Sequence, residues 1–278
     1  MILINKKDVP IFQFPHFIKF TGIEHGILTR NGGNSPEPYN TLNLSFGVGD
    51  RDDHVKSNRE KLSSCFYGKD FLFLKQVHGS NVLSLKKEST KSHVFQNRKD
   101  PLIADAAVTN IRGLILTIQV ADCQSVLLYD PTKEVVANIH SGWRGSIQNI
   151  IRRTVKVMEK VFNCCPSDIK AGVGPSLGPC CGEFVNYKKE IPQSMWKYKD
   201  KGYNFNFWNI SRDQLVDTGV LPENIKISNI CTSCNGDTFF SYRSQKTTGR
   251  FATVIGLKAS SKRKTPLIII AKNNYRLT

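Results

Sequence analysis

The sequence predicts a protein of the α/β or α+β class, because short apolar strands are followed by an amphipathic helix. Residues 71–77, 114–120, 125–129 and 135–139 are apolar and rich in β-branched or aromatic side chains, which is typical of buried strands. Residues 145–162 come next and repeat apolar side chains at the i, i+3, i+4 spacing of a helix with one buried face. A hydrophobic share of 40% and a charged share of 22% agree with a compact globular chain.

The ends of the chain and one internal segment differ from this pattern. Residues 86–101 are polar, lack periodicity and end in proline, so we expect a surface loop and not a domain linker. Residues 1–21 are expected to form a lead-in strand and loop. Residues 258–278 are expected to form a basic hinge, centred on SSKRKTP at 260–266, and an apolar tail in which LIII forms a terminal strand.

Composition also bears on where the protein acts. No stretch has the eighteen or so apolar residues of a membrane span, and the first residues, MILINKKDVP, lack the apolar core of a signal peptide. We therefore expect a cytoplasmic protein without membrane contact. In that reducing compartment the eight cysteines are expected to be thiols or metal ligands and not a disulfide framework.

The formal net charge of +16 favours phosphate-bearing ligands. It would also allow non-specific binding to nucleic acid, so a basic nucleic-acid-binding module is one alternative. No RNP, zinc-finger or helix-turn-helix signature accompanies the charge, and we expect no specific nucleic-acid recognition.

Three soft metal ligands stand at the ends of predicted strands. His78 follows 71–77, Cys123 follows 114–120, and His140 follows 135–139. Strand ends hold side chains over a crevice, where the next loop can shape a pocket. Two imidazoles and one thiolate suit zinc, and three protein ligands leave a fourth position open for a water or substrate. On spacing alone, packed or hydrogen-bonded side chains are the competing interpretation.

The remaining motifs are less specific. HSGWRG, residues 140–145, joins a strand to a helix, so backbone amides and Arg144 could receive a phosphate or carboxylate there. Cys231 and Cys234 form a CxxC pair without a matching second pair, and the doublets at 164–165 and 180–181 are not zinc knuckles. We interpret these thiols as packed or incidental, with a structural zinc at Cys231 and Cys234 as the alternative.

Ordered motifs across residues 22–257 resemble the bacterial multicopper polyphenol oxidoreductase, or laccase-like, proteins, many of which are regarded as purine nucleoside phosphorylases and adenosine deaminases. The motifs that carry the resemblance are GILTRNGG (26–33), TLNL (41–44), NR (58–59), KQVHG (75–79), ADA (104–106), ADC (121–123), HSGWRG (140–145), GP (174–175), CT (231–232), FFSYR (239–243) and GR (249–250). The resemblance implies that 22–257 form a single domain of mixed β-sheets flanked by helices, with a three-layer character.

In the family, the histidine of QVHG, the cysteine of ADC and the histidine of the HxGWRG segment bind zinc, which corresponds to His78, Cys123 and His140. The resemblance therefore implies a zinc-dependent purine nucleoside phosphorylase acting on inosine, adenosine or methylthioadenosine with phosphate, and adenosine deamination as a second reaction. Arg30, Asn43, Arg59 and Arg144 are the residues that we expect to line the substrate and phosphate pocket. Ser141 and Val120 depart from the usual family residues beside the ligands, which affects substrate preference more than metal binding.

Two further alternatives follow from the same trio. Two histidines and one cysteine also resemble a blue-copper site, so a polyphenol-oxidising copper enzyme is one rival, although the three methionines lie far from the ligands in sequence. A metal-free hydrolase is the other, with Cys123 as nucleophile and His78 or His140 as its base.

Overall fold

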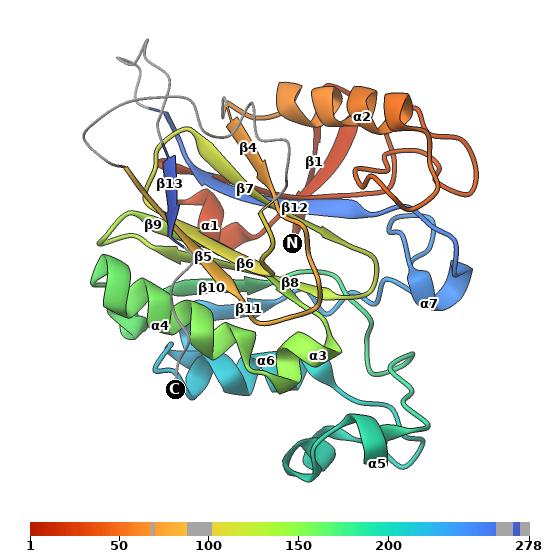
Figure 1. The fold of residues 1–278 in the computed structure, drawn as a ribbon, viewed down its shortest axis with the longest axis vertical. Coiled ribbons are helices and arrows are strands. Elements are labelled where there is room, and N and C mark those ends of the chain that lie inside the picture. The colour runs from red at the N-terminus through yellow and green to blue at the C-terminus, as the bar shows by residue number, and fades with distance from the viewer. Residues whose placement is uncertain (68–69, 88–101, 260–268, 273–278) are drawn as a thin grey trace.

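Two mixed β-sheets, packed face to face, form the centre of the protein. The structure, a computed structural model, describes residues 1–67, 70–87, 102–259 and 269–272 (Figure 1). Within these residues the first sheet has six strands in the order β1-β2-β3-β12-β7-β4. Their bounds are β1 Ile2–Lys6, β2 Val9–Gln13, β3 Ile23–Leu28, β12 Phe251–Leu257, β7 Leu114–Val120 and β4 Asp70–Phe73. Strands β4 and β7 pair in parallel and the other neighbours are antiparallel.

The second sheet has seven strands among the described residues, in the order β11-β10-β8-β9-β6-β5-β13. Their bounds are β11 Ile225–Ile227, β10 Lys170–Val173, β8 Gln124–Asp130, β9 Val135–Ser141, β6 Ala106–Thr109, β5 Val82–Lys87 and β13 Ile269–Lys272. The pairs β10–β11 and β5–β6 are parallel, and the others are antiparallel. Both sheets are therefore mixed, as expected.

Helices cover the outer faces of the sheets. The helices are α1 Pro15–Ile18, α2 Asp52–Ser64, α3 Trp143–Ile147, α4 Ile150–Phe162, α5 Tyr187–Glu190, α6 Phe207–Val216 and α7 Tyr242–Gln245, with 3₁₀ turns at Pro166–Asp168, Gln193–Tyr198 and Pro222–Asn224. In Figure 1, α3, α4 and α6 lie along the seven-stranded sheet, and α2 lies on the opposite side of the molecule. Helices, seven-stranded sheet and six-stranded sheet make the three expected layers, and α2 covers part of the third. No described helix has both the length and the apolarity of a membrane span.

The period-two alternation of the central strands explains how both faces of each sheet are buried. On β8, Leu127 points into the core between the sheets, whereas Val126 and Leu128 pack under the helical layer. On β7, Leu116 enters the core between the sheets and Ile115 joins the cluster beneath α2. Strands buried on both faces are mostly apolar, which is why they were recognisable in the sequence.

The structure confirms the predicted strands at β7, β8 and β9 and shortens the first, since β4 ends at Phe73. The expected helix 145–162 is divided into α3 and α4. Asn149 adopts a left-handed conformation with φ of 52°, and its side chain accepts the Arg152 amide at 3.0 Å to start α4. Apolar spacing continues through such a break, so the sequence did not reveal it.

The terminal segments add strands to the two sheets. Strands β1 and β2 pair with each other and β2 pairs with β3, so residues of the expected lead-in belong to the six-stranded sheet. In the expected apolar tail, β13 pairs with β5 at the edge of the seven-stranded sheet. Most of the expected surface loop, residues 88–101, and the expected hinge at 260–266 lie outside the described residues.

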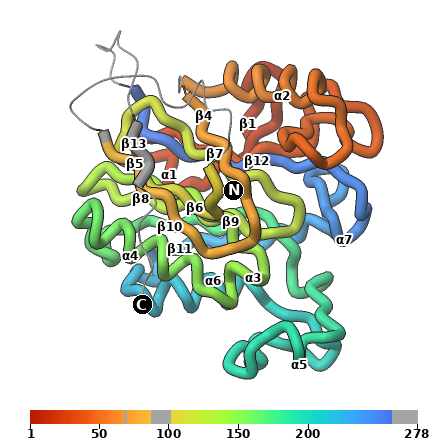
Figure 2. The backbone as a smooth tube through the Cα atoms, viewed as in Figure 1, coloured from red at the N-terminus to blue at the C-terminus, as the bar shows by residue number. Residues whose placement is uncertain are grey.

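The chain passes from one sheet to the other twice near the predicted ligands. It leaves the six-stranded sheet after β4 and enters the seven-stranded sheet at β5, and it crosses again between β7 and β8. A smaller lobe around α5 extends beyond the sheets (Figure 2) and has its own apolar cluster, which includes Ile191, Phe205 and Phe207. These crossings and this lobe surround His78, Cys123 and His140.

Candidate active site at the sheet crossings

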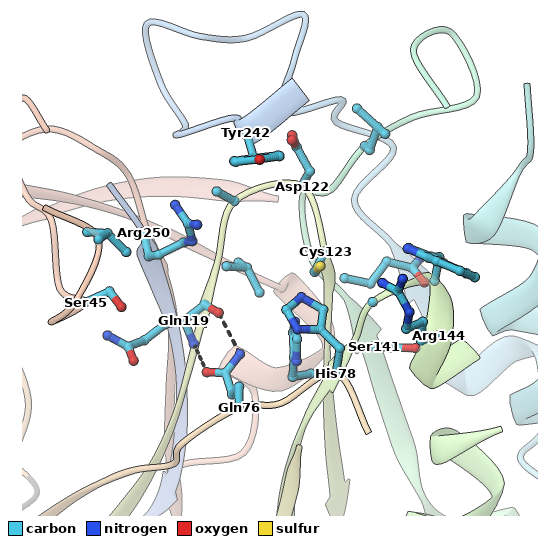
Figure 3. A pocket seen from close by; sticks show the side chains of 18 of the residues that line it. Ser45, Gln76, His78, Gln119, Asp122, Cys123, Ser141, Arg144, Tyr242 and Arg250 are labelled. Carbon is cyan, nitrogen blue, oxygen red and sulfur yellow. Dashed lines mark hydrogen bonds between the residues drawn. The ribbon is translucent and has the colours of Figure 1, made fainter. Parts of the chain in front are cut away.

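His78, Cys123 and His140 meet where the chain changes sheets. His78 follows β4, Cys123 lies in the turn between β7 and β8, and His140 is the next to last residue of β9. Their ligand atoms, one from each side chain, all lie within 4.8 Å of one another. The two imidazole rings meet at an angle of 76° with centroids 4.8 Å apart. Figure 3 shows His78 beside Cys123 at the centre of a pocket.

The backbone at two of these turns is held in the left-handed region. His78 has φ of 58° and Asp122, directly before Cys123, has φ of 84°. Non-glycine residues adopt such angles when surrounding contacts compensate, and they occur often at functional sites. The Asp122 carboxylate has such contacts, since it accepts the Thr232 and Ser241 hydroxyls at 2.7 and 2.6 Å and the Arg243 amide at 2.6 Å.

Asp105 orients two of the three candidate ligands. Its carboxylate accepts the His78 amide at 2.9 Å and the Gly79 amide at 2.8 Å, and it lies 2.8 Å from His140 Nδ1. In the last contact Nδ1 donates to the carboxylate, so a metal would bind at Nε2 in place of a proton there. A carboxylate behind a metal-binding histidine fixes the tautomer and raises the basicity of the ligand.

The protonation states of the trio favour a thiolate. Burial raises the pKa of Cys123, but the neighbouring charge of His140 and hydrogen bonds from both histidines outweigh it and bring the pKa to about 6. Burial lowers the pKa of His140, but Cys123 and Asp105 outweigh this effect and bring the pKa to about 9. Metals bind cysteine as the thiolate, so this set of two histidines and one cysteine, with one carboxylate behind it, fits zinc.

The trio opens into a cavity of about 940 Å³. This volume lies in the range of small-molecule sites. Aromatic and aliphatic side chains make up much of the wall, among them Phe46, Phe73, Trp143, Leu177, Phe184, Phe207 and Tyr242. Gln76 lies within it and exchanges two hydrogen bonds with the Gln119 backbone, at 2.8 and 2.9 Å (Figure 3). The cavity can therefore enclose a molecule with apolar rings and polar substituents.

Six cationic side chains line the same cavity. They are Arg59, Lys75, Arg144, Arg243, Lys246 and Arg250. Among the described residues, Asp122 is the one acidic side chain in the lining, and it is already occupied by the three donors named above. Across the described residues, none of the six forms an ion pair with a carboxylate. The cavity therefore has an uncompensated positive charge and favours an anion.

Stacking and backbone contacts hold these cations in place. The Arg59 guanidinium lies 3.7 Å from the Phe73 ring centroid and 4.4 Å from that of Phe46, and burial lowers its pKa to about 10, so it stays charged at neutral pH. Arg144 stacks on Trp143 at 4.1 Å. Arg250 donates to the carbonyls of Thr248 and Gly249. In Figure 3, Arg250 and Arg144 lie on opposite sides of His78 and Cys123.

Comparison with known proteins identifies the family. Residues 24–258 match the family described as multi-copper polyphenol oxidoreductase laccase. The chain belongs to this laccase family. It is 34% identical over 263 residues to the purine nucleoside phosphorylase YfiH of Shigella flexneri, covering 91% of this chain and all of that protein. It is 30% identical to the purine nucleoside phosphorylase YlmD of Bacillus subtilis, covering 84% of this chain and 88% of that protein.

Solved structures of related proteins have the same fold. YlmD from Geobacillus stearothermophilus superposes with a TM-score of 0.77 at 28% identity, covering 90% of this chain and 96% of that one. The YfiH protein of Bacillus licheniformis gives a TM-score of 0.78 at 28% identity, with the same coverage. These likenesses confirm the single α/β domain with two mixed sheets flanked by helices, and the relatives support a phosphorylase-like enzyme acting on a small molecule.

The laccase-family domain brings most of the predicted site residues together, but not all. His78, Cys123, His140, Arg59 and Arg144 line the cavity. Arg30 and Asn43 lie outside its lining. The buried Arg30 guanidinium donates to Asn40 and to the Gly236 carbonyl, and buried Asn43 binds Asp50 and accepts the Arg250 amide. Both residues support loops behind the pocket wall.

Several residues of the laccase-family site were not predicted individually. Asp105 and Arg250 belong to the short ADA and GR motifs, which carried the resemblance without an assigned role. Gln119 sits within a mostly apolar strand, where a long polar side chain is the detectable signal. Lys246 has no such signal, because it reaches the cavity only through the position of α7.

Proposed function

We propose that the protein is a zinc-dependent purine nucleoside phosphorylase that cleaves inosine, adenosine or methylthioadenosine with phosphate. The supporting observation is that the His78, Cys123 and His140 trio shares a cavity with six cations that have no carboxylate partner among the described residues. The relatives named purine nucleoside phosphorylase support the same reaction class. Adenosine deamination is proposed as a second reaction of this cavity.

Zinc would be held by His78, Cys123 and His140, with Asp105 fixing the orientation of the imidazoles. When bound, it supplies a Lewis acid that polarises a substrate oxygen or activates a water, the activity that deamination at purine C6 requires. The donor set favours zinc over a blue-copper centre, because no methionine of the described chain lines the cavity to serve as an axial ligand.

The cationic side chains would bind phosphate and neutralise it during the reaction. A phosphate oxygen forms a bond to the ribose anomeric carbon while the bond from that carbon to the purine nitrogen breaks. The bonding electron pair leaves with the purine, which takes up a proton. Arg59, Arg144 and Arg250 are fixed before substrate binds, so they oppose charge repulsion without reorganising, and such preorganisation is a main source of catalysis.

The aromatic wall would hold the purine. Trp143 and Phe184 meet edge to face with centroids 5.9 Å apart, and Phe184 packs against Phe207 at 5.4 Å. All three belong to or border the lobe that carries α5, so the base would lie between that lobe and the sheets. Planar purines gain from contact with such rings through dispersion and the ring quadrupole.

A metal-free cysteine hydrolase is a second candidate. It is favoured by the pKa of about 6 at Cys123, since a thiolate beside two imidazoles is a competent nucleophile. The two candidates differ in their inhibitors. Chelation abolishes the activity of a zinc enzyme, and added zinc restores it. A cysteine hydrolase keeps its activity after the metal has been removed, and alkylation of Cys123 then abolishes that activity.

The decisive experiment measures metal content and products in one preparation. Purified protein is analysed for zinc and copper, then incubated with inosine, adenosine or methylthioadenosine, with and without phosphate, and the bases and sugar phosphates are separated by chromatography. We expect phosphate-dependent release of purine and ribose 1-phosphate, lost in His78→Ala. Zinc-loaded protein that consumes none of the three nucleosides contradicts the proposal, and phenol oxidation by copper-loaded protein would support the copper alternative.

A further inference from the structure

Four cysteines form a second cluster outside the trio. Cys180 and Cys181 lie in the loop after β10, and Cys231 and Cys234 lie in the loop before α7. The four Sγ atoms lie within 4.8 Å of one another. Cys234 Sγ is 3.5 Å from Cys180 Sγ and 3.5 Å from Cys181 Sγ. None of the four is in a disulfide in the structure.

These distances are those of four ligands around one ion. Zinc–sulfur bonds of about 2.3 Å, arranged as a tetrahedron, place the sulfurs about 3.8 Å apart. A covalent disulfide would instead bring two sulfurs to about 2.05 Å. Incidental thiols have no reason to converge from two loops more than fifty residues apart in the chain.

The backbone around Cys231 is arranged for a thiolate. The amides of Gly178 and Cys234 donate to Cys231 Sγ, the first at 3.3 Å. In a CxxC pair that binds a metal, the local turn places the amide of the second cysteine so that it donates to the sulfur of the first. Such hydrogen bonds stabilise the negative charge of the thiolate. Gly178 also permits close approach of the loops, because an added Cβ would lie 3.0 Å from Cys231 Cβ.

We propose that Cys180, Cys181, Cys231 and Cys234 bind a structural zinc ion that clamps the β10 loop to the loop before α7. The site is closed, since four thiolates complete the tetrahedron and leave no position for a substrate. Cys180 and Cys234 are exposed, so the ion can enter from solvent. The sequence interpretation of incidental thiols therefore gives way to a four-cysteine site in which the doublet 180–181 partners the CxxC pair.

The clamp stabilises one wall of the cavity. The two loops already meet through Ser176 and Cys231, which form a parallel bridge, and through the Thr232 amide, which donates to the Ser176 carbonyl at 3.1 Å. Leu177 and Phe184 on the first loop and Tyr242 and Arg243 after the second line the cavity. Loss of the ion should thus loosen substrate contacts while leaving the His78, Cys123 and His140 trio in place.

Elemental analysis of the full chain tests the proposal without relying on activity. We expect the parent protein to contain one more equivalent of zinc than the double variant Cys180→Ser/Cys234→Ser. Cys165→Ser, which removes an exposed thiol outside the cluster, is the matched control and should keep the full zinc content. His78→Ala should lose the other equivalent, so failure of the four-cysteine site and failure of the catalytic site can be told apart.

Native mass spectrometry gives a second readout. A zinc ion adds its own mass and is released by acid, whereas each disulfide removes two hydrogens and survives acid but not a reductant. Unchanged zinc content in the double variant, or masses that show disulfides among the four cysteines in freshly reduced and zinc-exposed protein, overturns the proposal. Should the double variant unfold, Cys181→Ser alone must show the same loss of zinc.

Discussion

Asp105 and His140 form a buried polar pair in the candidate site, with carboxylate and Nδ1 2.8 Å apart and both side chains almost fully enclosed. Burial raises the pKa of the Asp105 carboxyl, but the hydrogen bonds from His140 and from backbone amides outweigh this and hold the pKa below its ordinary value. The carboxylate therefore stays ionised and keeps His140 aligned.

Asp105→Asn should weaken zinc binding at the trio. The carboxylate accepts three backbone amides and one imidazole, which an amide cannot do, so both histidines lose their fixed orientation. Loss of such a contact typically lowers metal affinity by roughly 10- to 100-fold. Competition with a zinc chelator measures the change, and Asp53→Asn, at an exposed carboxylate paired with Arg51, is the control. Equal affinities in the two variants would contradict the orienting role of Asp105.

Gly142→Ala should disturb the same centre from the opposite side. A Cβ at this position would lie 3.0 Å from His78 Cδ2 and 3.1 Å from Cys123 Sγ, so one ligand must shift. The backbone φ of −70° suits alanine, which keeps the fold intact. We expect weaker zinc binding with a nearly unchanged melting temperature. Gly22→Ala, which meets no atom within 4 Å, should change neither quantity.

Arg250→Gln should raise the KM for phosphate more than the KM for the nucleoside. Removing one charged donor to a phosphate oxygen costs about 1.5–3 kcal/mol, or roughly 10- to 100-fold in affinity. Initial rates at varied phosphate concentrations measure the effect. Arg112→Gln is the matched control, because Arg112 pairs with Glu134 outside the cavity. An equal rise in both KM values would show that Arg250 shapes the pocket without binding phosphate.

Acid should destabilise the fold through His25. Burial lowers the pKa of this side chain from 6.5 to about 3, and its neutral Nε2 accepts the Phe14 amide at 2.9 Å. Between these pH values the unfolded chain binds a proton that the folded chain does not. The free energy of unfolding therefore decreases as the pH is lowered through this range, by up to about 1.4 kcal/mol per pH unit from this residue.

His25→Gln keeps an acceptor for Phe14 but cannot titrate. The free energy of unfolding, measured with denaturant between pH 4 and 6.5, should thus depend less steeply on pH in this variant than in the parent protein. This holds whether or not the two proteins differ in stability at neutral pH. His16, whose pKa burial lowers to about 4, accounts for part of the slope that is left. Identical slopes in the two proteins would exclude His25 as the titrating group.

Local pattern was enough to predict the centre of the fold. Strands β7, β8 and β9 are buried on both faces, so each was a mostly apolar run, and His140 and Cys123 could be placed at strand ends. The break at Asn149 could not be predicted, because a single left-handed residue leaves the apolar spacing unchanged.

Contacts between distant segments account for what the sequence did not reveal. Arg30 has the same charge as Arg59, but only Arg59 reaches the cavity, since Arg30 turns to Asn40 and Gly236. Cys231 and Cys234 lacked a partner pair in the linear motif. Only the fold brings the loop after β10, which carries Cys180 and Cys181, beside them.

The passages of the chain between the sheets give the trio a mechanical role. His78 and Cys123 stand where the backbone leaves the six-stranded sheet for the seven-stranded one, and His140 belongs to the latter. An ion held by all three would cross-link the two sheets, because sliding one sheet over the other would stretch the bonds from the ion to its ligands. Amide hydrogens of β7 and β8 should then exchange with solvent more slowly in metal-loaded protein than in stripped protein.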